Sequence, residues 1–325
     1  MTAVSEETDQ IVEKLASGDR RAIARAISLV ENNSVASSEL LKKAYGRTGR
    51  GYRIGVTGPP GAGKSTLTNK LAKCFRRQGL RVGIIAVDPT SPFTGGALLG
   101  DRVRMSEVEL DEGVFIRSMA SRGSLGGLSK RAKEAADILD VAGHDVIMME
   151  TVGVGQSELD VAGAADTTIV VLVPESGDGI QAMKAGLMEI ADFFVLNKAD
   201  RPGAEQAVMS LKMILGFRPH HEGSWMPDVV KTQASEGKGV EEVAALIRRH
   251  QDFLRGTGGL EQKRRARLER RIREIIDDQL HIDFWNGERA LGLRRKIELI
   301  LQRQSNPYDA AAALIQDFKS GRGLQ

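Results

Sequence analysis

The stretch GVTGPPGAGKST, residues 55–66, decides how the rest of the chain is interpreted. Within it, Gly58 to Ser65 match the pattern G-x-x-x-x-G-K-[ST] in full. The strand-like run RIGVT at 53–57 leads into the match, and an amphipathic helical stretch at about 64–78 leads out of it. A strand, a glycine-rich loop and a helix in this order predict a phosphate-binding loop, because the loop N–H groups and the helix N-terminus then face the phosphates.

Each kind of residue in this loop has an expected role. The glycines allow the backbone to curl around the phosphates, and the Lys64 ammonium reaches the β- and γ-phosphates as a catalytic group. The Ser65 hydroxyl is an expected ligand of Mg²⁺. The residues predicted to contact the nucleotide in this loop are Gly58, Gly61, Ala62, Gly63, Lys64, Ser65 and Thr66.

Short β-branched runs alternate with helix-length segments on both sides of the loop. Strands that read as continuously apolar and are separated by helices indicate a parallel sheet covered on both faces. The predicted fold class is therefore α/β, with a mostly parallel central sheet flanked by helices over residues 50–255. The runs are RIGVT at 53–57, RVGIIAVD at 81–88, VFIRS at 114–118, DVIMME at 145–150, TTIVVLV at 167–173, DFFVLN at 192–197 and DVVKT at 228–232.

Helical patterns without strands flank this domain. Residues 1–49 carry helical apolar spacing that begins at Ile11 and continues with Ile23 and Ile27 after Asp19, a helix-starting residue, and they predict an N-terminal helical extension. Residues 256–325 open with GTGG and then show apolar helical faces, such as Leu268, Ile272 and Ile276. Helices beyond a finished α/β domain need a surface on which to bury these faces. We therefore expect a C-terminal helical arm that forms a homodimer.

The composition narrows the class of protein. The 325 residues are 41% hydrophobic and carry 46 basic against 43 acidic side chains, a net charge of +3. This balance is ordinary for a globular chain and gives no argument for a nucleic-acid or membrane partner. The single Cys74 excludes an internal disulfide, and the acidic start MTAVSEETDQ is unlike a secretion signal. These features predict a cytoplasmic protein.

Two aspartates follow the second predicted strand and are candidate magnesium ligands. Asp88 ends that strand, and Asp101 lies thirteen residues later in a stretch rich in proline and glycine. Magnesium prefers oxygen ligands, and such a stretch can become ordered around a γ-phosphate. The alternatives are a strand-end cap for Asp88 and a helix N-cap for Asp101.

The fourth predicted strand ends in an acidic residue, Glu150, where a Walker-B acid belongs. Glu150 either supports Mg²⁺ or orients the attacking water, and the sequence leaves both roles open. Gly153, three residues later, is expected to present its N–H to the γ-phosphate. A purely structural carboxylate is disfavoured at the end of an apolar strand, since an unpaired buried charge is costly.

The strand DFFVLN runs directly into Asn197-Lys198-Ala199-Asp200, an NKxD pattern. The Asp200 carboxylate can accept hydrogen bonds from the ring N–H and the exocyclic amine of guanine, and adenine offers no such pair of donors. Asn197 is expected to brace the loop, and the Lys198 stem to lie along the base. In this order after a phosphate-binding loop, the pattern predicts GTP rather than ATP.

Together these motifs make the sequence similar to the MeaB/ArgK family, P-loop GTPases that chaperone adenosylcobalamin-dependent acyl-CoA mutases. The resemblance covers nearly the whole chain, because the family also has an N-terminal helical extension and a C-terminal dimerisation arm. METVGVGQSE and the long aspartate-bounded loop are its most specific parts. The matching stretches are 55–66, AVDPTSPFTGGALLGDRVRM at 86–105, METVGVGQSE at 149–158, PESGDGIQAMKAG at 174–186 and LNKAD at 196–200.

The resemblance implies a GTPase of low intrinsic rate that docks on a mutase such as methylmalonyl-CoA mutase and gates its cofactor. Three nucleotide-responsive segments are implied, at 88–105, about 150–160 and about 175–186. In the last, Asp178, Gln181 and Lys184 match the family's polar switch residues, with plain surface charge as the alternative. Our hypothesis is that Lys184 reaches the nucleotide when the mutase is bound, as an arginine finger does.

The family's guanine loop usually contains Ser-Ala, and here it reads Gln233-Ala234-Ser235. We expect the Ala234 N–H to donate to the guanine oxygen despite this departure. No cobalamin-binding pattern of the D-x-H-x-x-G kind is present, so adenosylcobalamin is expected on the partner mutase, while this chain binds GTP, GDP and Mg²⁺.

Three other functions fit parts of the sequence. A P-loop ATPase or small-molecule kinase is disfavoured by the NKxD pattern. A nickel-insertion GTPase is disfavoured because the chain has no His-rich tract or Cys motif. The third function is a nucleotide-gated interaction module with another client, which overlaps with the chaperone function. Substitution of Lys64 by alanine separates the two, because a GTP-dependent effect on cobalamin transfer should vanish while simple docking persists.

Overall fold

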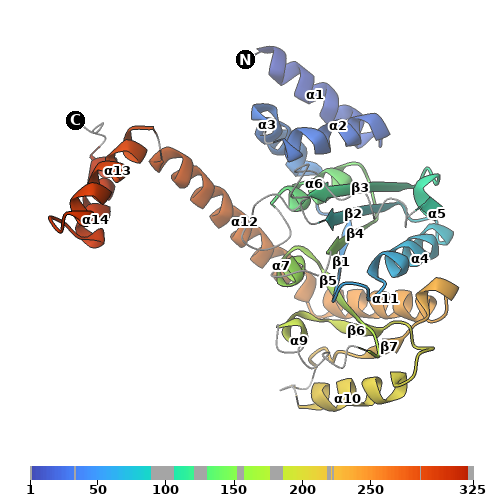
Figure 1. The fold of residues 1–325 in the computed structure, drawn as a ribbon. Helices are drawn as coiled ribbons and strands as arrows, with labels where there is room; N and C mark the ends of the chain where they lie inside the picture. Colours follow the sequence, from blue (N-terminus) through green and yellow to red (C-terminus); the bar gives the residue numbers. More distant parts are fainter. Residues whose placement is uncertain are drawn as a thin grey trace. The chain divides into compact units, whose positions relative to one another are not determined.

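The computed structural model describes residues 2–32, 34–88, 106–120, 130–151, 157–175, 186–217, 221, 223–285 and 287–320. The chain forms two compact units, residues 1–261 and 262–325 (Figure 1). The first contains the sheet and the N-terminal helices, and in the second the described residues form helices and the turns between them. The predicted division after residue 255 stays a prediction.

The core of the first unit is a seven-stranded sheet in which all neighbouring strands run parallel. The strand order is β3-β2-β4-β1-β5-β6-β7. The predicted α/β class with a parallel sheet is confirmed, and each predicted run coincides with a strand to within two residues. The strands are β1 (Tyr52–Thr57), β2 (Val82–Asp88), β3 (Val114–Ala120), β4 (Val146–Thr151), β5 (Thr167–Leu172), β6 (Phe193–Leu196) and β7 (Val229–Lys231).

The strand order places the phosphate-binding loop at the carboxyl end of a central strand. β1 lies between β4 and β5, so the chain moves to one side for β2 to β4 and to the other for β5 to β7. Ligands of open parallel sheets bind outside the carboxyl ends of the strands where the order reverses in this way. The carboxyl ends of β1, β4, β6 and β7 therefore lie on the same side of the sheet, although these strands are far apart in sequence.

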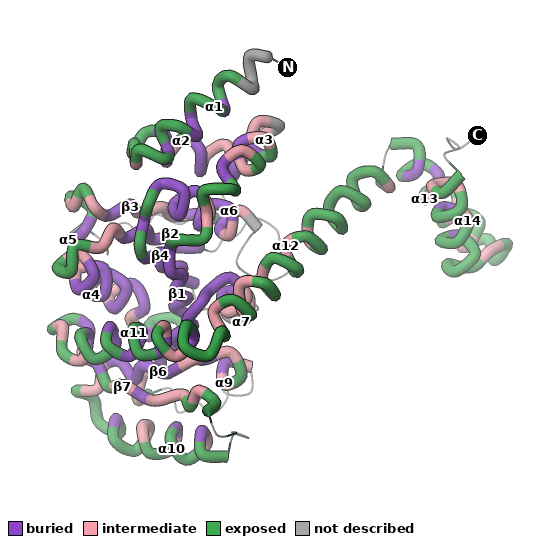
Figure 2. The backbone as a smooth tube through the Cα atoms, turned by 180° about the vertical axis from the view of Figure 1, so that it is seen from behind, coloured by how far each residue is buried: buried purple, intermediate pink, exposed green. Residues whose placement is uncertain are grey.

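Helices cover both faces of the sheet, and the strands between them are buried (Figure 2). One face packs on α4 (Lys64–Arg77), α5 (Ser106–Glu109) and α11 (Val240–Gly256). The other packs on α6 (Lys130–Val141) and α7 (Ser157–Ala164), and continues over β5 and β6 with α9 (Leu187–Ile190) and α10 (Ala204–Gly216). Alternate residues of each strand supply the two apolar layers, as a sheet covered on both faces requires.

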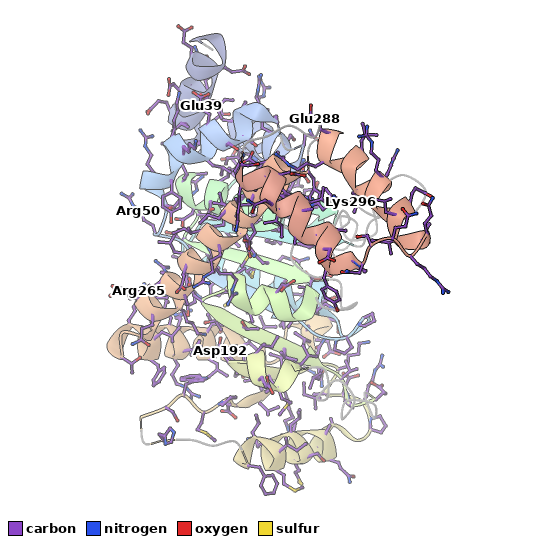
Figure 3. All side chains as sticks on the ribbon, turned by 90° about the vertical axis from the view of Figure 1, so that its left-hand side faces the viewer. Glu39, Arg50, Asp192, Arg265, Glu288 and Lys296 are labelled. Carbon is purple, nitrogen blue, oxygen red and sulfur yellow. The ribbon has the colours of Figure 1, made fainter. Side chains whose placement is uncertain are left out.

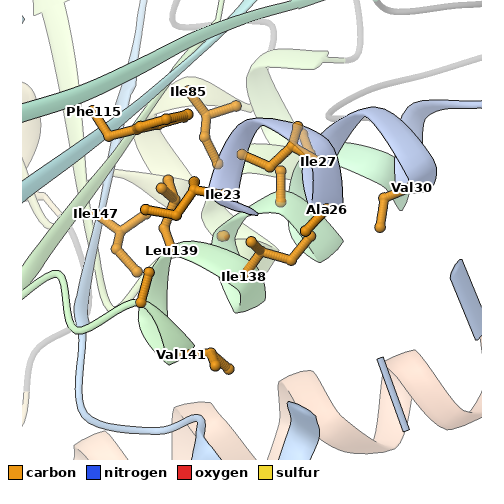
Figure 4. Packing of buried hydrophobic residues seen from close by; sticks show 14 of the residues in the cluster. Ile23, Ala26, Ile27, Val30, Ile85, Phe115, Ile138, Leu139, Val141 and Ile147 are labelled. Carbon is orange, nitrogen blue, oxygen red and sulfur yellow. The ribbon is translucent and has the colours of Figure 1, made fainter. Parts of the chain in front are cut away.

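The N-terminal helices share the core of the first unit. They are α1 (Thr2–Ala16), α2 (Arg20–Glu31) and α3 (Val35–Ala44), followed by the short η1 (Tyr45–Arg47). Asp19 caps α2 by accepting the Ala22 N–H at 2.7 Å, as its position before the apolar pattern predicts. Figure 4 shows Ile23 and Ile27 of α2 against Ile138 and Leu139 of α6. The predicted apolar face of this extension is therefore buried.

The second unit consists of α12 (Gly259–Phe284), α13 (Gly287–Leu301) and α14 (Pro307–Lys319). The first three residues of α12 belong to the first unit. The Arg289 guanidinium lies over the rings of Phe284 and Phe318 and donates to two backbone carbonyl groups of α12. Charged side chains such as Arg265, Glu288 and Lys296 extend along α12 and α13 (Figure 3). Within the described residues, no helix combines the length and apolar character needed to cross a bilayer.

Candidate nucleotide-binding site

The loop between β1 and α4 has the backbone shape that phosphate binding needs. Gly58, Gly61 and Gly63 all have φ in the left-handed region, at 133°, 75° and 88°. A Cβ atom on Gly58 would lie 2.1 Å from the Val171 carbonyl oxygen, and one on Gly63 would lie 2.3 Å from Asn197 Nδ2. Only glycine fits at these two positions, so the predicted curl of the loop is present and is enforced by its neighbours.

The Lys64 side chain folds back over this loop. Its Nζ donates to the carbonyl oxygens of Gly58 at 2.8 Å and Pro59 at 3.0 Å, and the residue is 6% exposed. The first turn of α4 begins at Lys64, so the ammonium group and the helix N-terminus bring positive charge to the same place. This arrangement suits the binding of a polyphosphate.

Ser65 and Glu150, which are 85 residues apart in sequence, are in direct contact. The Ser65 hydroxyl donates to Glu150 Oε1 at 2.5 Å, and both residues are buried. A hydroxyl and a carboxylate at a helix N-terminus are oxygen ligands of the kind that Mg²⁺ takes. The donor set therefore fits the magnesium site predicted from the sequence.

Asn197 connects three segments of the site. Its Nδ2 donates to the Ala62 carbonyl at 2.8 Å in the phosphate-binding loop. Its Oδ1 accepts from the Thr232 hydroxyl and from the Ala234 N–H, both at 3.0 Å. The side chain is 3% exposed, and the expected bracing role is carried by these bonds.

Lys198 and Arg201, which stand on either side of Asp200 in the chain, both hydrogen-bond to other segments. Lys198, which has a positive φ of 56°, donates from Nζ to the Gly61 carbonyl at 2.8 Å. Arg201 donates to Glu175 at 2.6 Å, and this hydrogen bond holds the pKa of the Glu175 carboxyl below its usual range. The NKxD loop is thus fastened to the phosphate-binding loop on one side and to the end of the β5 segment on the other.

The loop after β7 is a closed turn that includes the short helix η4 (Ala234–Glu236). Gln233 N–H donates to the Lys238 carbonyl at 3.0 Å, which closes the turn. A hydrogen bond from Lys238 to Glu236 raises the pKa of the Lys238 ammonium. The Ala234 N–H donates to Asn197 Oδ1 at 3.0 Å, and its expected contact with the guanine oxygen stays a prediction.

Several predicted residues lie outside the described part of the chain. They are Asp101, Gly153, Asp178, Gln181 and Lys184, and the side chain of Asp88 is also not described. The structure thus brings together the phosphate-binding loop, Glu150, the NKxD loop and residues 233–235. The roles of the remaining residues stay predictions.

Sequence reasoning missed several contacts of the described site, and three of them lie beside predicted motifs. Thr232 donates to Asn197, Thr151 donates to Thr57 at 2.9 Å, and the Pro59 carbonyl accepts from Lys64. Thr57 and Thr151 are immediate neighbours of recognised motifs, but nothing in either motif points to the other. Only the strand order makes these distant residues adjacent.

Comparison with known proteins identifies the family. Residues 23–289 match the family described as methylmalonyl Co-A mutase-associated GTPase MeaB. The chain belongs to the MeaB family. A Pyrococcus abyssi protein that carries a GTPase name is 48% identical over 319 residues, which are 96% of this chain and 97% of that protein. The mouse protein named methylmalonic aciduria type A homolog, mitochondrial, is 33% identical over 337 residues, covering 96% of this chain and 80% of its own length.

A solved structure that is similar to this chain agrees with the fold. The crystal structure titled LAO/AO transport system kinase superposes with a TM-score of 0.73 at 29% identity, covering 96% of this chain and 97% of that one. This MeaB-family chain is a P-loop GTPase, as the resemblance implied. The family match also covers the whole sheet and all described parts of the site.

Proposed function

We propose that this chain is a GTP-hydrolysing chaperone that docks on an adenosylcobalamin-dependent acyl-CoA mutase and gates loading, protection or reactivation of the mutase cofactor. The family description, which names a methylmalonyl-CoA mutase-associated GTPase, supports the client. The observation that carries the nucleotide part is the Asn197 side chain, which joins the phosphate-binding loop to the loop after β7. Adenosylcobalamin belongs to the mutase in this proposal.

The residues of the site divide the work of hydrolysis. The Lys64 ammonium and the loop N–H groups stabilise charge on the phosphates, while Ser65 and Glu150 hold Mg²⁺ or its water. Bound Mg²⁺ supplies neutralisation of the β- and γ-phosphate charge. Asp88 and Asp101 are proposed to complete this metal site, and Gly153 to donate to the γ-phosphate.

Asp200 is the proposed determinant of base choice, together with Lys198 and residues 233–235. Asp200→Asn should lower the affinity for GTP by about a hundredfold or more, since each unmade bond to a buried donor costs about 1–3 kcal/mol. The variant should instead bind xanthosine triphosphate, whose 2-oxo group accepts from the new amide. The change of base preference is measured by the binding of fluorescent guanine and xanthine nucleotides to the variant.

The matched control for Asp200→Asn is Glu205→Gln. Glu205 is an exposed acid nearby on α10 that pairs with Lys231 at 2.5 Å. This control should retain the wild-type preference for GTP. Equal affinity of Asp200→Asn for GTP and the xanthine nucleotide, with GTP unchanged, would contradict the assignment.

A kinase is the second candidate, because a relative's structure is titled a transport system kinase. A kinase passes the γ-phosphate to an acceptor, whereas a GTPase passes it to water. We expect stoichiometric inorganic phosphate from GTP with no added acceptor, and a much lower rate from ATP. Transfer of the γ-phosphate to an added acceptor, with little release of inorganic phosphate in its absence, would favour the kinase instead.

The client can be found by retention of purified mutases on the immobilised chain. Methylmalonyl-CoA, isobutyryl-CoA and 2-hydroxyisobutyryl-CoA mutases are the candidates, tested with a non-hydrolysable GTP analogue and with GDP. We expect one of them to be retained and its retention to depend on the nucleotide. A GTP-dependent change in its cofactor loading should disappear with Lys64→Ala, and retention of no mutase in either state would exclude this client class.

We also propose that α12 to α14 mediate homodimerisation. Among the described residues of α12 none is buried, and Leu268, Ile272, Ile276 and Leu280 are about half exposed along one side of the helix. Ile272→Glu combined with Ile276→Glu should halve the mass measured by light scattering, since burying a charge at an apolar interface is costly.

Asp277→Ala, on another side of α12, is the control and should leave the mass unchanged. A monomeric wild-type chain, or a dimer that survives both glutamates, would rule out this interface.

The chain is proposed to act in the cytoplasm, consistent with a single cysteine, the buried Cys74.

A further inference from the structure

The hydrogen bond between Thr57 and Thr151 joins the two central strands at the edge where the nucleotide site lies. Thr57 is the last residue of β1, directly before Gly58, and Thr151 is the last residue of β4, directly after Glu150. Their hydroxyl oxygens are 2.9 Å apart, with Thr151 as the donor. The two residues are 0% and 1% exposed.

This bond continues the strand pairing beyond the backbone register. The last paired residues of β1 and β4 are Val56 and Glu150. One residue further along, the two threonine side chains, which we call the threonine pair, hold the strands together. On their other sides the two residues are held by backbone pairing, Thr57 with Val170 and Thr151 with Val87, so the side-chain bond is the direct contact between these two positions.

The stability of the sheet does not explain why both residues carry a hydroxyl. Valine has the same branched shape, suits a buried strand and brings no polar atom that must be desolvated. Replacing both partners of a buried hydrogen bond by apolar groups of the same shape is often neutral or stabilising. What the hydroxyls add is direction, because a hydrogen bond fixes how the two strand ends lie relative to each other.

The position of Glu150 is the property that this restraint controls. The Glu150 carboxylate reaches Ser65 at the start of α4, and Thr151 follows it in the chain. Ser65 and Thr57 lie at the two ends of the same phosphate-binding loop. The loop and Glu150 are thus tied together twice, once through Ser65 and once through the threonine pair.

We infer that Thr57 and Thr151 are positioning residues that hold Glu150 against the phosphate-binding loop for magnesium-dependent hydrolysis. This inference rests on the proposed roles of Ser65 and Glu150. It assigns neither threonine a contact with the nucleotide. Loss of the pair should slow the reaction and loosen the end of β4, while leaving most of the nucleotide affinity in place.

The test compares three forms of the full-length chain. Thr57→Val combined with Thr151→Val keeps the shape and removes both hydroxyls, and Thr57→Ser combined with Thr151→Ser keeps both hydroxyls. We expect kcat for GTP to fall by about tenfold in the double valine variant, with less than about a twofold change in KM. The Mg²⁺ concentration for half-maximal rate should rise severalfold, and the double serine variant should restore both values.

A readout other than activity is hydrogen exchange of the segment 146–151. Its exchange should quicken in the double valine variant and match the wild type in the double serine variant. Thr57→Val combined with Thr151→Ala also removes both hydroxyls, and it gives the same comparison if the double valine variant folds poorly. Thr167→Val, which removes a buried hydroxyl bonded to Tyr52 and His250 elsewhere on the sheet, should keep the wild-type kcat and Mg²⁺ dependence.

Wild-type kcat and Mg²⁺ dependence in the double valine variant would overturn the inference. So would a double serine variant as slow as the double valine variant, because packing would then matter and not the hydrogen bond. Failure of the proposed function looks different, since the wild-type chain would then show no hydrolysis that Lys64→Ala removes.

Discussion

Replacing Lys64 with alanine should lower kcat/KM for GTP by about 10²–10³-fold or more, the scale seen when one preorganised donor to a developing charge is removed. Its Nζ lies within 3.0 Å of two carbonyl oxygens of the phosphate-binding loop, so its charge is held beside the loop that we propose to bind the phosphates. Release of inorganic phosphate measures the loss.

The binding of GDP separates two contributions of Lys64. If the ammonium acts mainly on the γ-phosphate, Lys64→Ala should lower the affinity for GDP by a smaller factor than it lowers the rate of GTP hydrolysis. Lys73→Ala, further along α4 and outside the loop, is the control and should keep the wild-type rate. Hydrolysis by Lys64→Ala at even a tenth of the wild-type rate would show that this loop does not act in the way we propose.

The largest expected effect on stability is at Asp140, near the end of α6. Its carboxylate accepts the N–H groups of Gly49 at 2.7 Å, Arg50 at 3.0 Å and Gly51 at 2.9 Å. The Arg53 guanidinium lies 3.7 Å from the same carboxylate and 2.6 Å from Asp137. Asp140 is 2% exposed, so this anion fixes the connection between the N-terminal helices and β1 from inside the protein.

Asp140→Ala should destabilise the chain by about 3–5 kcal/mol, because three backbone donors and a buried guanidinium lose a charged acceptor together. The melting temperature should fall by roughly 10 °C, measured by circular dichroism on the full chain. Asp140→Asn keeps one acceptor oxygen, so its melting temperature should fall less than that of Asp140→Ala.

The control for Asp140 is Asp252→Ala, which removes an exposed carboxylate of α11. A surface change of this kind is expected within about 0.5 kcal/mol of the wild type. If Asp140→Ala had the same melting temperature as the Asp252→Ala control, the connection before β1 would be held by packing alone.

Sequence reasoning did well where the signal is local. Seven strands, the start of α2 at Asp19 and the helix after Gly63 follow from periodicity, capping and turn chemistry within about ten residues. The NKxD pattern is equally local. Its assignment to guanine rests on chemistry that four adjacent residues carry.

The hydrogen bond of Ala234 within the chain was not predicted, for a physical reason. The sequence shows only that Ala234 has a backbone N–H in the loop after β7. In the folded chain, Asn197 Oδ1 accepts this N–H at 3.0 Å. Asn197 lies 37 residues earlier and becomes a neighbour only because β6 and β7 pair in parallel.

The sequence by itself determined which chemical groups are present and in what order along the chain: a phosphate-binding loop, an acidic strand end and a guanine-selective motif. Tertiary structure alone decided which of those groups touch. Ser65 meets Glu150, Asn197 meets Ala62, Thr57 meets Thr151 and Asp140 meets Gly49, across separations of 85 to 135 residues. Local patterns cannot predict such contacts, because each depends on the strand order and on how the helices pack on the two faces of the sheet.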